Sequence, residues 1–322
     1  MDLILATDQG VVTASPSGAG WRVQHRGLEE QHATSVIARE GIILAGTRQG
    51  VFRTEDDGQH WRAASAGLDI PIVRWIAFHP QVSDWELAGT EPAGIYLSQD
   101  GAKIWQPCQE VAEMRRQYGW SLPYSPEAGC VRGFALLGDR AYAAVEVGGV
   151  LVSDDRGQHW TLARGSRGQE GFSPPADQVH SDVHSLEVHP SDPDLVFAPT
   201  GGGLYRSQDG GATWALLYRC YCRAILLDPQ DPDHLAFGPA EGVDRNGSLV
   251  ESFDGGQTWQ AADAGLETPW ARTMVERFAR LGAHVFAVLS DGRLYVSETS
   301  QLKWQPVLPD VPGIRAVTSM VA

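Results

Sequence analysis

The chain has 322 residues, of which 43% are hydrophobic and 20% are charged. This composition excludes an intrinsically disordered protein and allows a sizeable buried core. The formal net charge of −15 argues against a nucleic-acid partner, because a phosphate-binding surface needs a dense basic patch. The opening MDLILATDQG has neither a basic stretch nor a long apolar run, so we predict no membrane segment and a cytoplasmic location.

Short strands separated by tight turns are predicted along the chain. DLILAT at 2–7 is followed by apolar or alternating runs such as VRWIAFHP, WELAGT and GIYLS, a pattern typical of β-strands. Only EVAEMRRQYGW, at 110–120, has helical character. Four cysteines in this length do not make a disulfide framework, and we expect them to be reduced. The sequence therefore predicts an all-β protein.

A short turn recurs down the chain, and each copy ends in tryptophan. The clear copies are TEDDGQHW ending at Trp61, SQDGAKIW at Trp105, SDDRGQHW at Trp160, SQDGGATW at Trp214 and SFDGGQTW at Trp259. Two degenerate copies end at Trp21 and Trp304. By subtraction of their numbers, successive tryptophans are 40 to 55 residues apart, which is close to the length of a four-stranded propeller blade.

The pattern S-x-D-x-G-x-x-W resembles the Asp-box, or bacterial neuraminidase repeat, and the chain resembles the sialidase-like Asp-box β-propellers. In that family the box is the hairpin between the third and fourth strands of a blade. Asp209 can accept hydrogen bonds from its own turn, and Trp214 can bury a large surface between blades. We expect the same structural role for Asp254 and Trp259, and no catalytic role for the box.

Seven copies predict a single seven-bladed propeller domain over 1–322. The chain starts directly with a second-strand sequence at 2–7, whereas VPGIRAVTSMVA at its end matches the pattern of first strands. We therefore predict that 313–322 pairs beside 2–7 and completes the first blade. Such pairing closes the ring and removes exposed sheet edges.

The face opposite the box turns is the predicted functional face, because the starts of the innermost strands lie there together with the turns between second and third strands. In one register at the strand starts stand Ser35, Arg74, Arg132, His184, Arg223, Glu276 and Arg315. The turns carry Asp8, Arg48, Glu91, Glu146, Glu241 and Asp291. Innermost strands line the central channel, so we expect these side chains to surround one mouth.

Two interpretations of this mouth stay open. The arginines and carboxylates can pair with one another and only seal the channel. Alternatively, the arginines can bind a carboxylate, sulfate or phosphate through bidentate hydrogen bonds. The predicted ligand-binding residues of the mouth are Arg48, Arg74, Glu91, Arg132, Arg223 and Arg315.

Two long insertions, 106–130 and 161–181, are predicted to rise on the same box-free face. The first carries Trp120 and Tyr124, and aromatic residues on a loop above a pore suit ligand stacking. In the alternative interpretation, these aromatic side chains pack the insertion onto the propeller.

A histidine pair follows the second insertion. His180 and His184 lie four residues apart, but SDVHSLEV has the pattern of a strand, so the two imidazoles need not converge. A divalent metal on His180 and His184, general base chemistry by His184 beside Glu146, and a structural role are the alternatives. No other cofactor is expected.

The resemblance does not decide whether the protein is an enzyme or a binding scaffold. A sialidase is disfavoured because the repeat count gives seven blades rather than six and no tyrosine–glutamate pair can be assigned to the mouth. A glycoside hydrolase or lyase acting on an acidic saccharide stays an alternative, with Glu146, His184 and Glu276 as its candidate catalytic residues. The chain also resembles photosystem II stability/assembly factors and sortilin-type propellers, which implies a peptide or protein partner. We expect a scaffold that binds an anionic small molecule, saccharide or peptide terminus.

Overall fold

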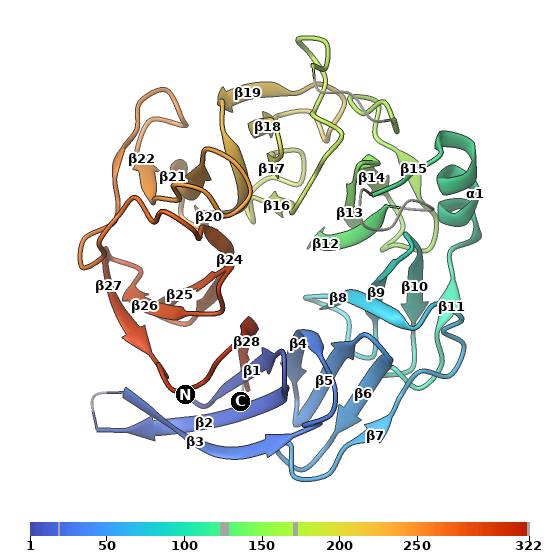
Figure 1. The fold of residues 1–322 in the computed structure, drawn as a ribbon. Helices are drawn as coiled ribbons and strands as arrows, with labels where there is room; N and C mark the ends of the chain where they lie inside the picture. Colours follow the sequence, from blue (N-terminus) through green and yellow to red (C-terminus); the bar gives the residue numbers. More distant parts are fainter. Residues whose placement is uncertain (19, 123–128, 170–172, 321–322) are drawn as a thin grey trace.

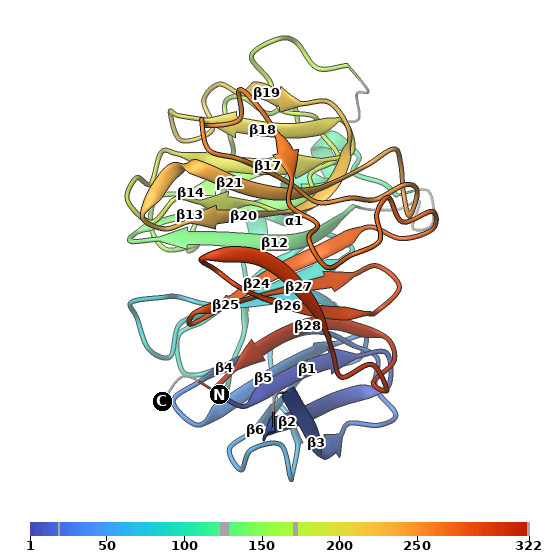
Figure 2. The ribbon, with the colours of Figure 1, turned by 90° about the vertical axis from the view of Figure 1, so that its left-hand side faces the viewer.

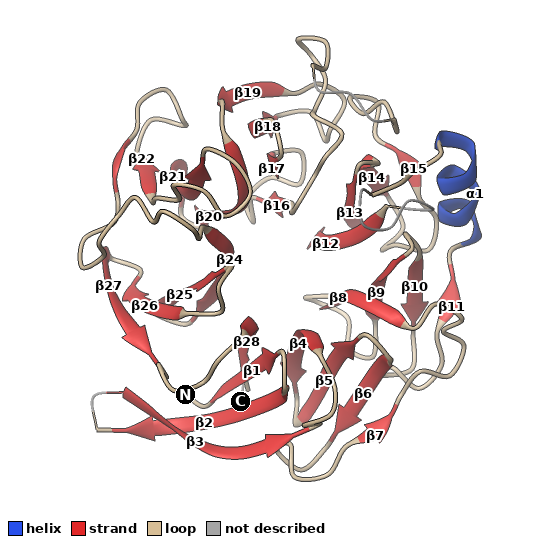
Figure 3. Ribbon diagram, viewed as in Figure 1, coloured by secondary structure: helices blue, strands red, loops and turns tan. Residues whose placement is uncertain are grey.

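The computed structural model of the protein describes residues 1–322 except 19, 123–128, 170–172 and 321–322. Its strands form seven four-stranded antiparallel sheets, which are arranged as the blades of a ring (Figures 1 and 3). The side view shows the blades edge-on, with the first strand β1 (Leu3–Thr7) and the last strand β28 (Ile314–Ser319) in the same part of the ring (Figure 2). The predicted all-β seven-bladed propeller is confirmed.

The blades follow one another in chain order, and the strands of each blade are named from the innermost outward. Blade 1 comprises β28 (Ile314–Ser319), β1 (Leu3–Thr7), β2 (Gly10–Ser17) and β3 (Gly20–Gly27). Blade 2 comprises β4 (Ala33–Arg39), β5 (Ile42–Thr47), β6 (Gly50–Thr54) and β7 (Arg62–Ala63). Blade 3 comprises β8 (Ile72–Phe78), β9 (Glu86–Glu91), β10 (Ile95–Ser98) and β11 (Gln106–Pro107). Blade 4 comprises β12 (Cys130–Leu137), β13 (Arg140–Glu146), β14 (Gly149–Ser153) and β15 (Thr161–Leu162).

The last three blades repeat this arrangement. Blade 5 comprises β16 (Glu187–Val188), β17 (Val196–Thr200), β18 (Gly203–Ser207) and β19 (Ala215–Tyr218). Blade 6 comprises β20 (Tyr221–Asp228), β21 (Asp231–Ala240), β22 (Val250–Ser252) and β23 (Gln260–Ala261). Blade 7 comprises β24 (Val275–Leu281), β25 (His284–Leu289), β26 (Leu294–Glu298) and β27 (Gln301–Val307).

The ring closes through pairing of the two ends of the chain. Strand β28 pairs antiparallel with β1, with Leu3 opposite Ser319 and Leu5 opposite Val317. The predicted closure by a C-terminal strand beside the N-terminal blade is confirmed.

The core consists of apolar layers between neighbouring blades. Strand β1 shows why: Leu3 and Leu5 pack toward blade 7, whereas Ile4 and Ala6 pack toward blade 2. Both faces of the strand are buried, so its sequence is continuously apolar rather than alternating. Clusters of this kind lie at each of the seven blade interfaces. The layers hold the blades at fixed positions around the central axis.

The Asp-box turns contain the hydrogen bonds that were predicted from their aspartate residues. The Asp209 carboxylate accepts hydrogen bonds from the Ser207 hydroxyl and the Thr213 amide, both at 2.8 Å. The Ser207 oxygen accepts one from the amide of Gly211, whose φ of 86° favours glycine. Asp254 makes the equivalent bonds in blade 6. The indole of Trp214 is 2% exposed and lies in the layer between blades 4 and 5, while Trp259 packs against Phe237.

The helix α1 (Gln109–Tyr118) lies at the outer rim beside blades 3 and 4 (Figure 1). It matches the predicted helical segment, and it ends at Gly119, which adopts the left-handed conformation with a φ of 64°. Arg115 donates to the carbonyl of Ala93, and Glu110 accepts from the amide of Trp160. Among the described residues, no helix combines the length and apolar character needed to cross a bilayer.

Candidate functional site

A β-bulge recurs near the start of the innermost strand in six blades. The ladder register shifts between Val73 and Trp75 in blade 3, and between Val131 and Gly133 in blade 4. A bulge re-aims the extra residue without disturbing the rest of the ladder. The residues at the six bulges are Thr34, Arg74, Arg132, Arg223 with Ala224, Glu276 and Arg315. The bulges thus explain why these side chains share one register around the channel.

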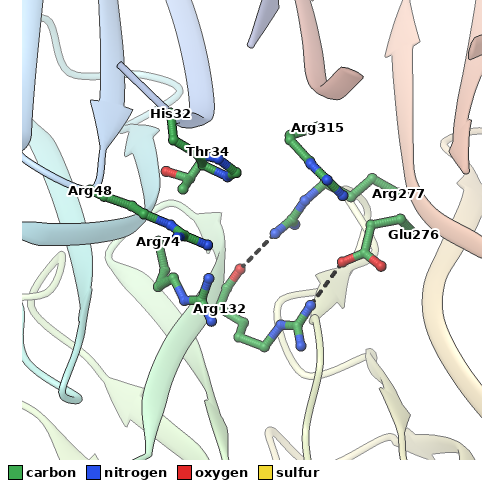
Figure 4. Close-up of a pocket in the computed structure, with 8 residues that line it drawn as sticks. All are labelled: His32, Thr34, Arg48, Arg74, Arg132, Glu276, Arg277 and Arg315. Atoms are coloured by element: carbon green, nitrogen blue, oxygen red, sulfur yellow. Dashed lines mark hydrogen bonds and ion pairs between the residues drawn. The ribbon is translucent and has the colours of Figure 1, made fainter. Parts of the chain in front are cut away.

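Five of the six bulges, all but that of blade 6, contribute a side chain to the lining of a cavity of about 220 Å³ (Figure 4). We call this cavity the mouth. Its wall is formed by His32, Thr34, Arg48, Arg74, Arg132, Glu276, Arg277 and Arg315. The structure therefore brings together most of the arginines that the sequence suggested.

Four of the predicted arginines form ion pairs with carboxylates, and three of these pairs have the same design: Arg74–Glu91, Arg315–Asp8 and Arg132–Glu146. Arg74 lies 2.8 Å from Glu91, and Arg315 binds both oxygens of Asp8 at 2.6 and 2.7 Å. Each pair joins a bulge residue to a turn between a second and a third strand. In these pairs the arginines and carboxylates of the mouth neutralise one another, as in the first of the two interpretations.

Glu276 links two further arginines across the channel. Its carboxylate accepts hydrogen bonds from Arg132 at 2.8 Å and from Arg223 at 2.5 Å. Arg132 also lies 3.1 Å from Glu146. The three blades 4, 6 and 7 are thereby connected by one chain of ion pairs.

The two glutamates of this chain are ionised. Burial alone raises the pKa of a carboxyl, but the neighbouring Arg223 and Arg132 outweigh it and hold the pKa of Glu276 well below its usual range. Burial also opposes ionisation of Glu146, yet the charge of Arg132 leaves the pKa of Glu146 below its ordinary value. Neither group can donate a proton at neutral pH.

Arg277 is a residue of the mouth that the repeat pattern of the sequence did not reveal. Its guanidinium carbon lies 3.8 Å from the centre of the Trp75 ring, and it donates to the carbonyl of Arg132 at 3.4 Å (Figure 4). Among the described residues it has no carboxylate partner within 4.0 Å. Burial, with the positive charges of neighbouring arginines, outweighs the nearby carboxylate of Glu276 and lowers the pKa of Arg277 to about 10. The wall of the mouth thus holds a partly buried cation without an ion-pair partner within 4.0 Å among the described residues.

Arg48 and His32 occupy the opposite part of the wall (Figure 4). Arg48 is exposed, and its side chain forms no hydrogen bond or ion pair in the described part of the chain. His32 lies 3.2 Å from Asp8, and burial lowers the pKa of His32. Arg48 was predicted, whereas His32 was not, because it precedes its strand rather than standing at the strand start.

One prediction in blade 2 is wrong. Ser35 aligns in the sequence with the arginines of the other blades, but Thr34 is the bulged residue and lines the mouth. Ser35 is fully buried. The error has the same cause as the omission of Arg277, because strict alternation of side chains does not reveal a bulge.

His184 belongs to a different set of contacts beside the mouth. Its Nδ1 lies 2.8 Å from the carbonyl of Cys222, which can only accept, so Nδ1 carries a proton. Its Nε2 lies 3.2 Å from both Asp182 Oδ2 and the Tyr221 hydroxyl. Although burial opposes it, the electrostatic interaction and the hydrogen bond with His184 lower the pKa of Asp182 to about 2.

The donor set around His184 differs from the predicted histidine pair. Possible ligand atoms of Glu146, Asp182 and His184 all lie within 4.8 Å of one another. His180 is not part of this group; its Nδ1 accepts from the amide of Asp182 at 3.2 Å. A metal at this position would therefore use Glu146 and Asp182 rather than His180.

The aromatic residues predicted above the pore lie elsewhere or outside the described residues. Trp120 is 1% exposed, donates to the carbonyl of Gly168 at 2.7 Å and packs with Val111 and Trp160. It joins the two insertions and does not line the mouth, so the packing interpretation holds for this side chain. Tyr124 falls within 123–128 and lies outside the described residues.

Comparison with known proteins supports the assignment of the repeat. Residues 250–261 match the family model described as BNR/Asp-box repeat. No curated protein sequence matches the chain. An ancestral GH74 enzyme has 17% identity and a TM-score of 0.63, over 91% of this chain and 39% of that one. The GH74 xyloglucanase from Xanthomonas campestris has 16% identity and the same TM-score, over 86% of this chain and 45% of that one.

A third similar structure matches over most of its length. YCF48 bound to D1 peptide has 16% identity and a TM-score of 0.63, over 92% of this chain and 87% of that one. The chain spans less than half the length of the two GH74 enzymes. At these identities the likeness shows the fold alone. The protein is a seven-bladed β-propeller that carries BNR/Asp-box repeats.

Proposed function

We propose that this protein is a binding scaffold that holds an anionic ligand at the mouth, on the face opposite the Asp-box turns. The observation that carries the proposal is the state of Arg277. Its guanidinium lies on the wall of the cavity without a carboxylate within 4.0 Å among the described residues. A desolvated cation is costly unless it is paired. A bound anion would supply the missing partner through charge-assisted hydrogen bonds.

Binding is favoured over turnover by the state of the carboxylates. Glu146 and Glu276 are ion-paired with arginines and stay ionised, whereas a glycoside hydrolase needs one protonated carboxyl as general acid. A hydrolase or lyase on an acidic saccharide is therefore the weaker alternative.

The ligand class is narrowed by the size and position of the mouth. A cavity of about 220 Å³ holds a small anion or the charged end of a longer molecule. A carboxylate, an acidic sugar and a peptide terminus all meet this description. The similarity to YCF48, whose structure contains a bound D1 peptide, supports including a peptide among the candidates.

A thermal-shift experiment at constant ionic strength tests the proposal. The panel contains galacturonate, sialate and short peptides, each beside a neutral counterpart such as galactose or the amidated peptide. We expect at least one anion to raise the melting temperature, because a ligand that binds only the folded state stabilises it. The shift should disappear in Arg277→Met and persist in Arg22→Gln, which alters an exposed arginine of β3, the outermost strand of blade 1. An unchanged shift in Arg277→Met would place the ligand elsewhere.

A further inference from the structure

The groups of the mouth do not balance in charge. The arginines on its wall or ion-paired to that wall are Arg48, Arg74, Arg132, Arg223, Arg277 and Arg315. The carboxylates paired with them are Asp8, Glu91, Glu146 and Glu276. Six guanidinium groups therefore face four carboxylates, which leaves an excess of two positive charges.

The count of carboxylates covers ion-paired groups only. Two further carboxylates act on these arginines without an ion pair within 4.0 Å in the described part of the chain: Asp244 on Arg315 and Asp182 on Arg132. Of the six guanidinium groups, those of Arg277 and Arg48 are the two that have no ion-pair partner within 4.0 Å among the described residues.

Burial lowers the pKa of His32, so its imidazole adds no charge at neutral pH. Asp182 lies beside His184 and is not part of the wall. Glu187 lines a separate small cavity on the other side of Arg277 and forms no ion pair with it within 4.0 Å in the described part of the chain.

The two guanidinium groups without an ion-pair partner among the described residues, those of Arg277 and Arg48, differ in their exposure to solvent. Arg277 is the more buried of the two: its guanidinium lies over the Trp75 ring, near the carboxylate of Glu276 and the side chains of Arg74, Arg132 and Arg223. Arg48 is exposed and enters from the other side of the wall (Figure 4). Both guanidinium groups border the same cavity. A single bound group, or the two ends of a short ligand, can therefore contact both.

We propose that the ligand of the mouth carries two negative charges, as a dicarboxylate, a phosphate monoester or a sulfate does. The inference rests on the proposed anion-binding function and specifies the charge of its ligand. A monoanion would neutralise one guanidinium and leave the second without a partner. A dianion matches the excess of two charges and gives each of Arg277 and Arg48 its own acceptor.

Matched pairs of probes test this charge requirement by calorimetry. At pH 8 and constant ionic strength, succinate is compared with butyrate, glycerol phosphate with dimethyl phosphate, and sulfate with nitrate. We expect the dianion of at least one pair to bind about tenfold more tightly than its monoanion, because it makes one more charge-assisted contact. The pair that shows the largest ratio tells whether a carboxylate, phosphoryl or sulfate group is preferred.

Two variants locate the effect. Arg277→Met and Arg48→Gln should each bring the ratio of dianion to monoanion affinity close to one, whereas Arg22→Gln, in the outermost strand of blade 1, should leave it unchanged. Arg48 is exposed, so its variant is expected to fold, and a melting curve without ligand checks both proteins. Burial and three neighbouring arginines together outweigh Glu276 and disfavour the charge of Arg277, so its replacement should not lower the unliganded melting temperature.

The outcomes separate the two proposals. Equal affinity for dianions and monoanions in the wild type overturns the charge requirement and leaves anion binding in place. A dianion preference that survives in both mouth variants also overturns it, because the ligand then lies outside the mouth. Absence of binding by every anion of either charge overturns the proposed function together with the inference.

Discussion

Glu86 shows how a single buried group sets a pH dependence. It is 1% exposed, and its Oε2 accepts a hydrogen bond from the Ala102 amide at 3.0 Å. Burial raises the pKa of Glu86 from 4.5 to about 7. The folded state therefore holds the proton more tightly than the unfolded state does. The stability from this group is complete below about pH 4.5 and is lost as the pH rises through 7.

Replacement by glutamine should remove this loss, because the amide keeps an acceptor for Ala102 and does not ionise. We expect Glu86→Gln to raise the free energy of unfolding at pH 8 by up to about 3 kcal/mol, since one pKa unit corresponds to about 1.4 kcal/mol. At pH 4 the two proteins should be similar. Urea unfolding at both pH values measures the difference, with Glu267→Gln, at an exposed position, as control. Parallel pH profiles of wild type and Glu86→Gln would contradict the assignment.

At the scale of the element, the Asp-box is a structural hairpin whose tryptophan fills the layer between two blades. Trp214 is 2% exposed and packs among residues of blades 4 and 5. Trp214→Ala should lower the free energy of unfolding by about 3–5 kcal/mol, because the cavity adds to the lost burial. Denaturant unfolding checks this, with Thr213→Ala as a control at an exposed position of the same turn. An unchanged midpoint would show that the turn does not depend on its tryptophan.

Because of the β-bulges, only part of the site could be predicted from the sequence. The arginines at 74, 132, 223 and 315 could be predicted because their spacing repeats with the blades, and they do gather around the mouth. Arg277 could not, because alternation would point it away from the side occupied by Glu276. The extra residue of a bulge changes that alternation, and nothing in the dipeptide Glu276–Arg277 indicates it. Ion-pair partners, such as Glu276 for both Arg132 and Arg223, depend on distances across the ring.

At the scale of the whole molecule, the closure of the ring by β28 is expected to control cooperativity. This strand supplies the innermost position of blade 1 and pairs with the N-terminal strand β1. Deletion of 313–322 should expose the edge of β1 and open the layers on both sides of blade 1. We expect a broader thermal transition and self-association in size-exclusion chromatography. Deletion of 321–322 alone serves as control, and a monomer with a sharp transition after the larger deletion would contradict this role.

The fold itself was predictable because its sequence pattern occurs seven times. Each copy of the box predicts one blade, and the apolar runs between the boxes predict the strands of that blade. The closing strand could also be predicted. The chain begins with a second strand, so the innermost strand of the first blade had to come from another part of the sequence. The short strand β16, with only Glu187 and Val188, shows where the repeated pattern weakens.

The recurrence of the bulges in six blades makes the mouth open to redesign. Thr34 occupies the position that arginine holds in four other blades, so one framework already accepts different side chains there. A library that varies this position would change one sector of the cavity lining, and it would replace the hydrogen bond from the Thr34 hydroxyl to the Val73 carbonyl of blade 3. Substitutions made in one blade at a time would change the ligand selectivity of the mouth in small steps.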